Sequence, residues 1–232
     1  MNEEVFFEDL LHPERAKQHI AQGTEEWDRM RIGRFTSSEM WKLLTNPRSK
    51  ADQEAGKLSE TALTYIQVKV AETITQKQKE NSYAYPLVYG KETEPLAIEY
   101  FCEKTGFIHE SIGFVPFGEH AGGSPDGIIN DIDILEVKCP FAIDTQVDYL
   151  MLTDQWDLKR IFPEYYWQVQ SNLLFTGKEK GHFVAYDPRY PDDKKLVHLI
   201  VKPIAEDFDR ITNAIAKAVE EKLKILNLLS HA

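Results

Sequence analysis

The sequence predicts a single α/β (α+β) domain with a small mixed central sheet flanked by helices. Its 232 residues suit one domain with a full hydrophobic core, so we take 1–232 as that domain and 1–22 as an N-terminal extension. Apolar residues make up 42% and charged residues 28%, as in ordinary globular proteins. Helical periodicity dominates the first hundred residues, strand-like segments follow, and a long amphipathic helix closes the chain.

The first helices are marked by their capping residues. Thr24 is the expected N-cap of a helix with acidic residues in its first turn, and Gly33 interrupts that helix. The sequence TSSE at 36–39 has the pattern of a capping box, so we expect a second helix through Leu44 with Thr36 or Ser37 as its cap.

Longer helices follow this region. Residues 46–56 are polar and turn-rich, so we expect a loop there. Helices are expected over 59–76 and 91–105. The apolar residues that share one face of the 59–76 helix are Leu63, Ile66, Val70 and Ile74.

Strand-like sequence begins after residue 106. We expect one strand over 107–117 and two between 127 and 137, around a turn at 130–131. A helix over 164–175 follows, and then two strands over 182–186 and 196–201. The last helix, over 204–229, either covers its own core or forms an interface, and the first role is favoured. Its apolar stripe consists of Ile204, Phe208, Ile211, Ile215, Val219, Leu223 and Leu226.

Composition restricts where the protein acts. No apolar run approaches the ~20 residues that span a bilayer. The acidic start lacks the pattern of a signal peptide, and Cys102 and Cys139 form no evident disulfide framework, so we expect a cytoplasmic protein with reduced thiols. The net charge of −11 leaves two readings: the chain never meets nucleic acid, or its basic groups converge inside a cleft while the outside stays acidic.

Two acids and a lysine form the most informative pattern. SPDG at 124–127 precedes EVKCPF at 136–141. Side chains alternate along a strand, so Glu136 and Lys138 should share one face while Val137 turns into the core. Asp126 lies one short strand earlier and is expected to face Glu136 across the turn. Burying this trio without a purpose would be costly.

A hard divalent cation explains the trio. Mg²⁺ prefers oxygen ligands, so Asp126, Glu136 and the backbone carbonyl of Val137 are its expected ligands. Lys138 either holds and helps to deprotonate a water, because a cationic neighbourhood can depress the pKa of a lysine, or balances charge at the phosphate.

The order P-D-(x)n-E-x-K resembles the signature of the restriction-endonuclease-like superfamily. Within it, SPDG, EVKCPF, WQVQ (167–170) and YDPR (186–189) resemble the phage-type alkaline exonucleases of the lambda exonuclease or YqaJ family, over about 23–189. The resemblance implies a restriction-endonuclease-like core. It also implies a Mg²⁺-dependent nuclease that digests linear duplex DNA from 5′ ends, releases 5′-mononucleotides, and leaves a 3′ overhang for a single-strand annealing partner.

The resemblance also implies roles for further residues. Arg31 corresponds to the arginine that receives the 5′-terminal phosphate, with Thr36 and Ser38 as small hydroxyls beside it. Glu94 corresponds to a helix acid near the metals. Ser124 either contacts substrate or only forms the turn. The loop over 46–56, with Arg48 and Lys50, either grips the DNA backbone or is a mobile surface loop.

Residues two apart on a helix do not share a face, so only one of Gln168 and Gln170 should reach the site, and the resemblance favours Gln168. The YDPR segment is assigned a packing or DNA-backbone role. The glycine-rich residues before Ser124 offer no further aspartate, which leaves a third metal-linked acid there in doubt.

Assembly and alternatives complete the predictions. The resemblance implies two Mg²⁺ ions sharing Asp126, with Mn²⁺ as a candidate substitute, a homotrimeric ring around DNA, and a phage or prophage protein in the bacterial cytoplasm. Two alternatives stay open: an endonuclease or 3′-end nuclease of the same superfamily, and a non-catalytic subunit that binds DNA ends.

Overall fold

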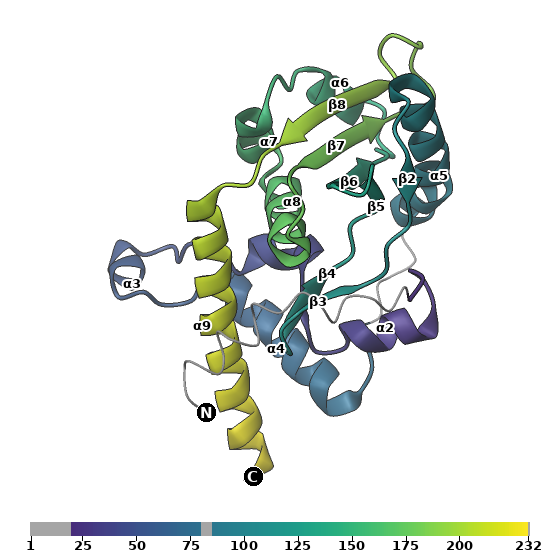
Figure 1. Ribbon diagram of the computed structural model, residues 1–232. Helices are drawn as coiled ribbons and strands as arrows, with labels where there is room; N and C mark the ends of the chain where they lie inside the picture. Colours follow the sequence, from purple (N-terminus) through teal and green to yellow (C-terminus); the bar gives the residue numbers. More distant parts are fainter. Residues whose placement is uncertain (1–19, 80–84, 232) are drawn as a thin grey trace.

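Two small sheets lie at the centre of the chain, and helices surround them (Figure 1). The computed structural model describes residues 20–79 and 85–231, so the expected N-terminal extension lies almost wholly outside the described residues. The helices are α2 (Glu25–Arg31), the 3-10 helix η2 (Ser37–Lys42), α3 (Lys50–Glu54), α4 (Glu60–Thr75), α5 (Tyr85–Thr105), α6 (Thr145–Leu150), α7 (Gln155–Ile161), α8 (Pro163–Thr176) and α9 (Ala205–Ser230).

The larger sheet has five strands in the order β2-β5-β6-β7-β8. They are β2 (His109–Glu110), β5 (Gly127–Ile129), β6 (Asp133–Lys138), β7 (Gly181–Tyr186) and β8 (Leu196–Val201). Strands β6 and β7 are parallel, and the other neighbouring pairs are antiparallel. A parallel pair needs a long crossover, which α6, α7 and α8 provide. The predicted mixed sheet is therefore confirmed.

The smaller sheet has the order β1-β4-β3, formed by β1 (Phe35–Thr36), β4 (Ala121–Gly123) and β3 (Val115–Phe117). Strand β1 runs parallel to β4, with Thr36 opposite Gly122. A Cβ on Gly122 would lie 2.2 Å from the ring of Phe114, so only glycine fits there. This pairing brings the segment that follows α2 beside the segment that leads to Asp126.

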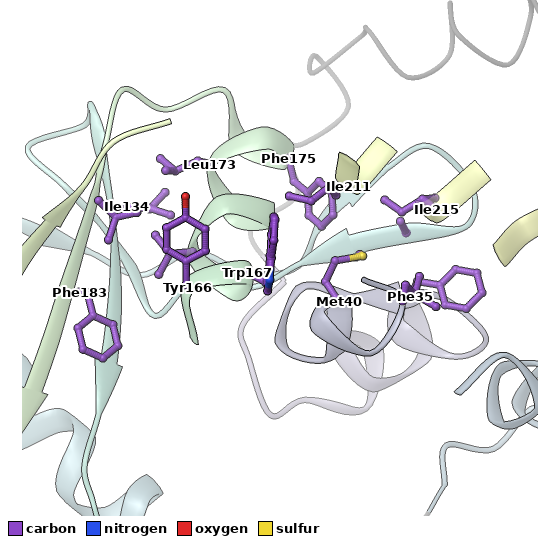
Figure 2. Packing of buried hydrophobic residues seen from close by; sticks show 14 of the residues in the cluster. Phe35, Met40, Ile134, Tyr166, Trp167, Leu173, Phe175, Phe183, Ile211 and Ile215 are labelled. Atoms are coloured by element: carbon purple, nitrogen blue, oxygen red, sulfur yellow. The ribbon is translucent and has the colours of Figure 1, made fainter. Parts of the chain in front are cut away.

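Strand β6 separates two apolar clusters. Ile134 belongs to the larger cluster with α8, whereas Leu135 and Val137 belong to the smaller cluster with α5. Because side chains alternate along a strand, Glu136 and Lys138 share the face of Ile134. Figure 2 shows that α8 lies between the sheet and the remaining helices of the larger cluster. The labelled residues there include Ile134, Phe183, Tyr166, Trp167, Leu173, Met40 and Ile211.

Most of the long predicted elements are confirmed. Helices α4 and α8, the turn between β5 and β6, and strands β7 and β8 lie within two residues of their predicted bounds. Thr24 caps α2 by accepting the N–H of Trp27 at 3.2 Å. Three residues of the α9 stripe, Ile211, Ile215 and Val219, are buried in the larger cluster, so α9 does cover its own core.

The single strand predicted over 107–117 is wrong. The segment forms β2 in the larger sheet and β3 in the smaller one, with an irregular stretch between them. Gly113 lies in that stretch, and a Cβ on it would lie 1.9 Å from the carbonyl oxygen of Ile20. Another part of the chain therefore crosses where a continuous strand would have run.

Other predictions in the N-terminal half also need correction. The Thr36 side chain makes no capping hydrogen bond, and the helix that follows is a 3-10 helix. The expected loop over 46–56 contains the short helix α3. Helix α5 begins six residues before the predicted position 91. On α4, Leu63 and Ile74 are exposed, because the buried face is centred on Ile66 and includes polar residues.

Candidate active site

Asp126 is fixed where the chain enters β5. Its backbone N–H donates to the carbonyl of Leu135 at 3.0 Å, which continues the β5–β6 pairing by one residue. Its carboxylate oxygen Oδ2 accepts the N–H of Val137 at 2.7 Å. The first acid of the motif is therefore hydrogen-bonded to the peptide that directly follows Glu136, as the predicted meeting across the turn requires.

Glu136 is completely buried and has a partner on each oxygen. Lys138 Nζ lies 2.6 Å from Oε1, which confirms that the two side chains share one face of β6. Asn172 Nδ2, from α8, donates to Oε2 at 3.1 Å. The ammonium of Lys138 also lies 4.9 Å from the ring centre of Tyr165 on α8. The end of β6 and one face of α8 together enclose the carboxylate.

Glu94 approaches the same place from α5. It lines a cavity of about 780 Å³ together with Asp126 and His109, and the His109 ring nitrogen Nε2 lies 3.1 Å from the carbonyl oxygen of Asp126. Burial and the charge of Asp126 raise the pKa of Glu94 to about 7. The structure therefore brings Glu94 close to the two acids of the motif, as the sequence comparison implied.

Negative charge exceeds positive charge in this cluster. Burial raises the pKa of Asp126, and it raises the pKa of Glu136 to about 8 although Lys138 opposes the shift. Three carboxyl groups thus interact with one ammonium group, and their ionised forms are disfavoured by burial and by one another. A divalent cation would relieve this repulsion, so the charges of the cluster fit a metal site.

The available oxygens also fit Mg²⁺. Within a strand the N–H and C=O of one residue point to the same edge, so the carbonyl of Val137 points to the side on which Asp126 accepts its N–H. Across the described residues, no three His, Cys, Asp or Glu side chains are grouped to hold an ion. Carbonyl, water and phosphate oxygens would complete the shell around Asp126 and Glu136, as Mg²⁺ usually requires.

The protein groups around Lys138 do not by themselves give the depressed pKa that one of its two expected roles requires. Burial lowers its pKa, but attraction to Glu136 and Asp126 outweighs burial and raises the pKa above its usual value. The surroundings are acidic and not cationic. Lys138 is therefore an ammonium group, which favours the alternative role of balancing charge at a phosphate.

The three residues expected to bind the terminal phosphate line one pocket. Arg31, Thr36 and Ser38 lie on the wall of a cavity of about 720 Å³. The guanidinium of Arg31 stacks on the Trp27 ring at 3.9 Å from its centre. Among the residues that the structure describes, no carboxylate forms a salt bridge with Arg31, which leaves its N–H groups available to an anion.

Ser124 is connected to this pocket through Trp27. The indole Nε1 donates to Ser124 Oγ at 2.9 Å, while the same ring stacks on Arg31. Ser124 lies two residues before Asp126. One tryptophan therefore joins the arginine of the phosphate pocket to the segment that positions the first acid.

The two glutamines of α8 have different surroundings. Gln170 donates to Tyr166 Oη and to the carbonyl of Lys202, and it accepts the N–H of Ile204, so its role is structural. Gln168 lies one helical turn before Asn172, the residue that contacts Glu136. Gln168 is thus on the face of α8 that encloses the acids.

Arg189 of the YDPR segment fixes the loop after Lys138. It forms hydrogen bonds of 2.8 Å and 2.7 Å with the two oxygens of the buried Asp187. It also donates to the carbonyls of Pro140 and Phe141 at 2.9 Å and 3.0 Å. This matches the packing role that was one of the two expected.

Sequence reasoning missed Asn172, Tyr165, His109 and Trp27. Two of these had a visible signal, because Tyr165, Gln168 and Asn172 are spaced three and four residues apart and so share one helical face. The contacts of His109 and Trp27 join segments that are distant in the sequence, so local sequence spacing does not predict them.

Known proteins share this architecture. A model of the YqaJ-like viral recombinase domain matches residues 26–179. An alkaline exonuclease, LHK-Exo from Laribacter hongkongensis, is 25% identical with a TM-score of 0.74 over 90% of this chain and 97% of that chain, and its complex with dAMP matches equally. A phage related exonuclease from Haemophilus somnus 129PT is 17% identical with a TM-score of 0.71, over 84% and 96% of the two chains.

Two results are negative. No curated protein sequence matches the chain. No helix among residues 20–79 and 85–231 has the length and apolar character needed to cross a membrane.

The solved exonuclease structures confirm the predicted restriction-endonuclease-like α/β class. Since the family model spans well over half of the sequence, the chain belongs to the YqaJ-like viral recombinase domain family.

Proposed function

We propose that this protein is a Mg²⁺-dependent exonuclease that degrades one strand of linear double-stranded DNA in the 5′-to-3′ direction. The products would be 5′-mononucleotides and a 3′ overhang. One observation carries the proposal: Asp126 accepts the N–H of Val137, the residue between Glu136 and Lys138, and Lys138 is paired to Glu136. A binding module has no need for buried acids where a phosphate is to lie.

Each residue of the cluster has a proposed task. Asp126, Glu136 and the Val137 carbonyl would hold Mg²⁺, and Glu94 would help to hold a second ion that shares Asp126. Bound Mg²⁺ would supply activation of water and polarisation of the phosphate, and Mn²⁺ is a candidate substitute. Lys138 would stabilise the negative charge that builds up on the scissile phosphate.

The direction of digestion rests on the pocket around Arg31. Its guanidinium fork suits a terminal phosphate, and the hydroxyls of Thr36 and Ser38 line the same cavity. Ser124 would act through its hydrogen bond with Trp27. Gln168 would hold the attacking water from the face of α8. A 5′-phosphate bound at Arg31 would place the adjoining nucleotide between this pocket and the acids.

Related proteins support this assignment in outline. LHK-Exo is named an alkaline exonuclease, and one of its structures contains dAMP, a mononucleotide. We extend exonuclease activity on DNA to this chain on that basis.

We treat the chain as one nuclease domain, because α9 packs into the same apolar cluster as α4 and α8. A ring of three copies around DNA would reconcile the net charge of −11 with DNA binding, with basic groups facing inward.

The test compares three substrates at matched concentration: linear duplex with 5′-phosphate ends, the same duplex with 5′-hydroxyl ends, and closed circles. We expect Mg²⁺-dependent release of mononucleotides, fastest from 5′-phosphate ends, and none from circles. Lys138→Ala should lower the rate by at least about 100-fold, whereas Lys202→Ala, at an exposed position, should not.

Three outcomes would contradict the proposal. Cutting of closed circles would favour an endonuclease. Binding of ends without Mg²⁺-dependent release of nucleotides would favour a non-catalytic subunit. A Lys138→Ala variant with the wild-type rate would remove the proposed role of this residue. Sedimentation tests the assembly separately, because a strict monomer would exclude the ring.

The remaining partners follow from the proposed reaction. A 3′ overhang is the substrate of a single-strand annealing protein, which we propose as the partner in recombination. The bacterial cytoplasm, in a cell that carries the phage or prophage, is the proposed location. Co-purification with a single-strand annealing protein from the same cell would support both, and its failure at physiological salt would count against the partnership.

A further inference from the structure

The chain makes a tight turn directly after Arg31. The N–H of Arg34 donates to the carbonyl of Arg31 at 3.1 Å. Ile32 has φ −55° and ψ 124°, and Gly33 has φ 70°, which are the angles of a type II turn. A Cβ on Gly33 would lie 2.5 Å from Thr73 Oγ1, so both its conformation and its surroundings require glycine.

Charged side chains hold both backbone groups of Gly33. Its N–H donates to Glu72 Oε2 on α4 at 3.0 Å, and its carbonyl accepts from Lys222 Nζ on α9 at 2.8 Å. Lys69 Nζ also lies 2.9 Å from Glu72 Oε2. The three residues are no more than 5% exposed. Residues 33, 72 and 222, far apart in the sequence, thus meet where α4 and α9 lie beside the turn (Figure 1).

Stability alone does not explain this arrangement. Burying charged groups costs about as much as their pairing returns, and well-packed apolar side chains of similar size would stabilise the fold equally well. Here Glu72 and Lys222 each hold one backbone atom of Gly33, while Lys69 pairs with Glu72, and the other carboxylate oxygen of Glu72 accepts the N–H of Lys79 at 3.3 Å. Their specific effect is to fix the orientation of the turn.

The turn joins two walls of the phosphate pocket. Arg31 precedes it, and β1 with Thr36 follows it. The N–H of Thr36 is held in turn by Tyr65 Oη at 3.0 Å, so the chain is anchored to α4 on that side as well. A small rotation of the Gly33 peptide would move Arg31 relative to Thr36. Such a change would spoil a site that must match the geometry of a phosphate.

We infer that Lys222 and Glu72 are positioning residues that set the preference for a 5′-phosphate end, by holding Gly33 and with it the two walls of the pocket. The inference rests on the proposed function, since it assigns these residues to the pocket proposed for the terminal phosphate. It gives α9 a second task beside covering the core. Lys222 does not touch the substrate and acts through Arg31.

The experiment measures the ratio of digestion rates on 5′-phosphate and 5′-hydroxyl ends. Lys222→Met keeps the length of the side chain and removes the donor to Gly33. We expect this ratio to fall about tenfold while the rate on 5′-hydroxyl ends is kept. Lys224→Met is the matched control, because Lys224 is two residues further along α9 and its side chain is 65% exposed. Its ratio should equal that of the wild type.

The outcomes separate this inference from the proposed function. Equal wild-type rates on both ends would contradict the phosphate pocket itself, and the inference with it. A wild-type preference that survives in Lys222→Met would overturn only the inference. So would an equal fall of both rates in that variant, because Lys222 would then affect folding alone.

A second measurement covers the case in which Lys222→Met is too unstable to assay. Hydrogen exchange at the Gly33 amide of the wild-type protein then tests whether Glu72 holds the turn. An amide held by buried Glu72 should be protected as strongly as the amides of α4. Exchange at the rate of an open loop would overturn the inference.

Discussion

Replacing Asn172 by alanine should weaken the response to Mg²⁺ without unfolding the protein. Asn172 Nδ2 donates to the carboxylate oxygen Oε2 of Glu136 at 3.1 Å, and both residues are fully buried. A hydrogen bond to a charged group contributes about 1.5–3 kcal/mol. That range corresponds to about 10- to 150-fold, in agreement with the 10- to 100-fold loss typical for residues that orient a metal ligand.

The structure also indicates why the fold should survive this change. Asn172 Oδ1 is buried and has no hydrogen-bond partner among the described residues, so alanine removes an unsatisfied acceptor together with the useful donor. The second carboxylate oxygen of Glu136 keeps its ion pair with Lys138. The loss should therefore appear in activity and metal affinity more than in the melting temperature.

The assay is a titration of the digestion rate with Mg²⁺. For Asn172→Ala the half-saturating Mg²⁺ concentration should rise by about 10- to 100-fold, with much of the rate recovered at high Mg²⁺. Asn213→Ala, at an exposed position on α9, is the control and should follow the wild-type curve. An unchanged Mg²⁺ midpoint in a folded Asn172→Ala protein would refute the reasoning.

Two further predictions concern stability. Gly123→Ala should lower the free energy of unfolding by about 1–3 kcal/mol in denaturant titration, because the new Cβ would lie 2.2 Å from Asn172 Oδ1; a wild-type midpoint would contradict this. His198 is exposed on β8, but its ring packs against Phe101 and His182, and this partial burial lowers its pKa to about 4. Burial also lowers the pKa of its hydrogen-bond partner His182. Between about pH 6.5 and about pH 4 the unfolded chain therefore binds protons that the folded chain does not. The free energy of unfolding should decrease as the pH is lowered through this range. His198→Gln should reduce this dependence in melts recorded against pH, and identical slopes in both proteins would contradict it.

The positions of the two acids and the lysine could be predicted from the sequence because strand geometry is simple. Alternation along β6 places Glu136 and Lys138 on one face without any knowledge of the rest of the fold. A short turn after β5 brings β6 back beside Asp126, so the three residues lie on neighbouring strand segments. The same local logic accounts for α8 and α9, whose long apolar periodicity predicts a buried face.

Local sequence could not predict the elements that depend on distant partners. Strand β1 has two residues and β4 ends in two glycines, and each exists only because the other lies beside it. The continuous strand expected over 107–117 fails because Ile20 crosses at Gly113. Helices α6 and α7 have six and seven residues, too short for a clear periodic signal.

The surroundings of the site residues were hidden for the same reason. The pKa of Lys138 depends on which charges face it, and the chain brings acids from three separate segments to that point. Charged residues such as Glu72 and Lys222 are usually solvated, and local sequence does not show that these two are buried. Their function is visible only when α4 and α9 are seen to meet at Gly33.

The most direct test of the active centre is anomalous diffraction from crystals of the protein soaked with Mn²⁺. We predict a peak at bonding distance, about 2.2 Å, from carboxylate oxygens of both Asp126 and Glu136 and from the carbonyl oxygen of Val137. No peak at this position in crystals saturated with the ion, or a peak that contacts only one of the two acids, would contradict the shared-cation site.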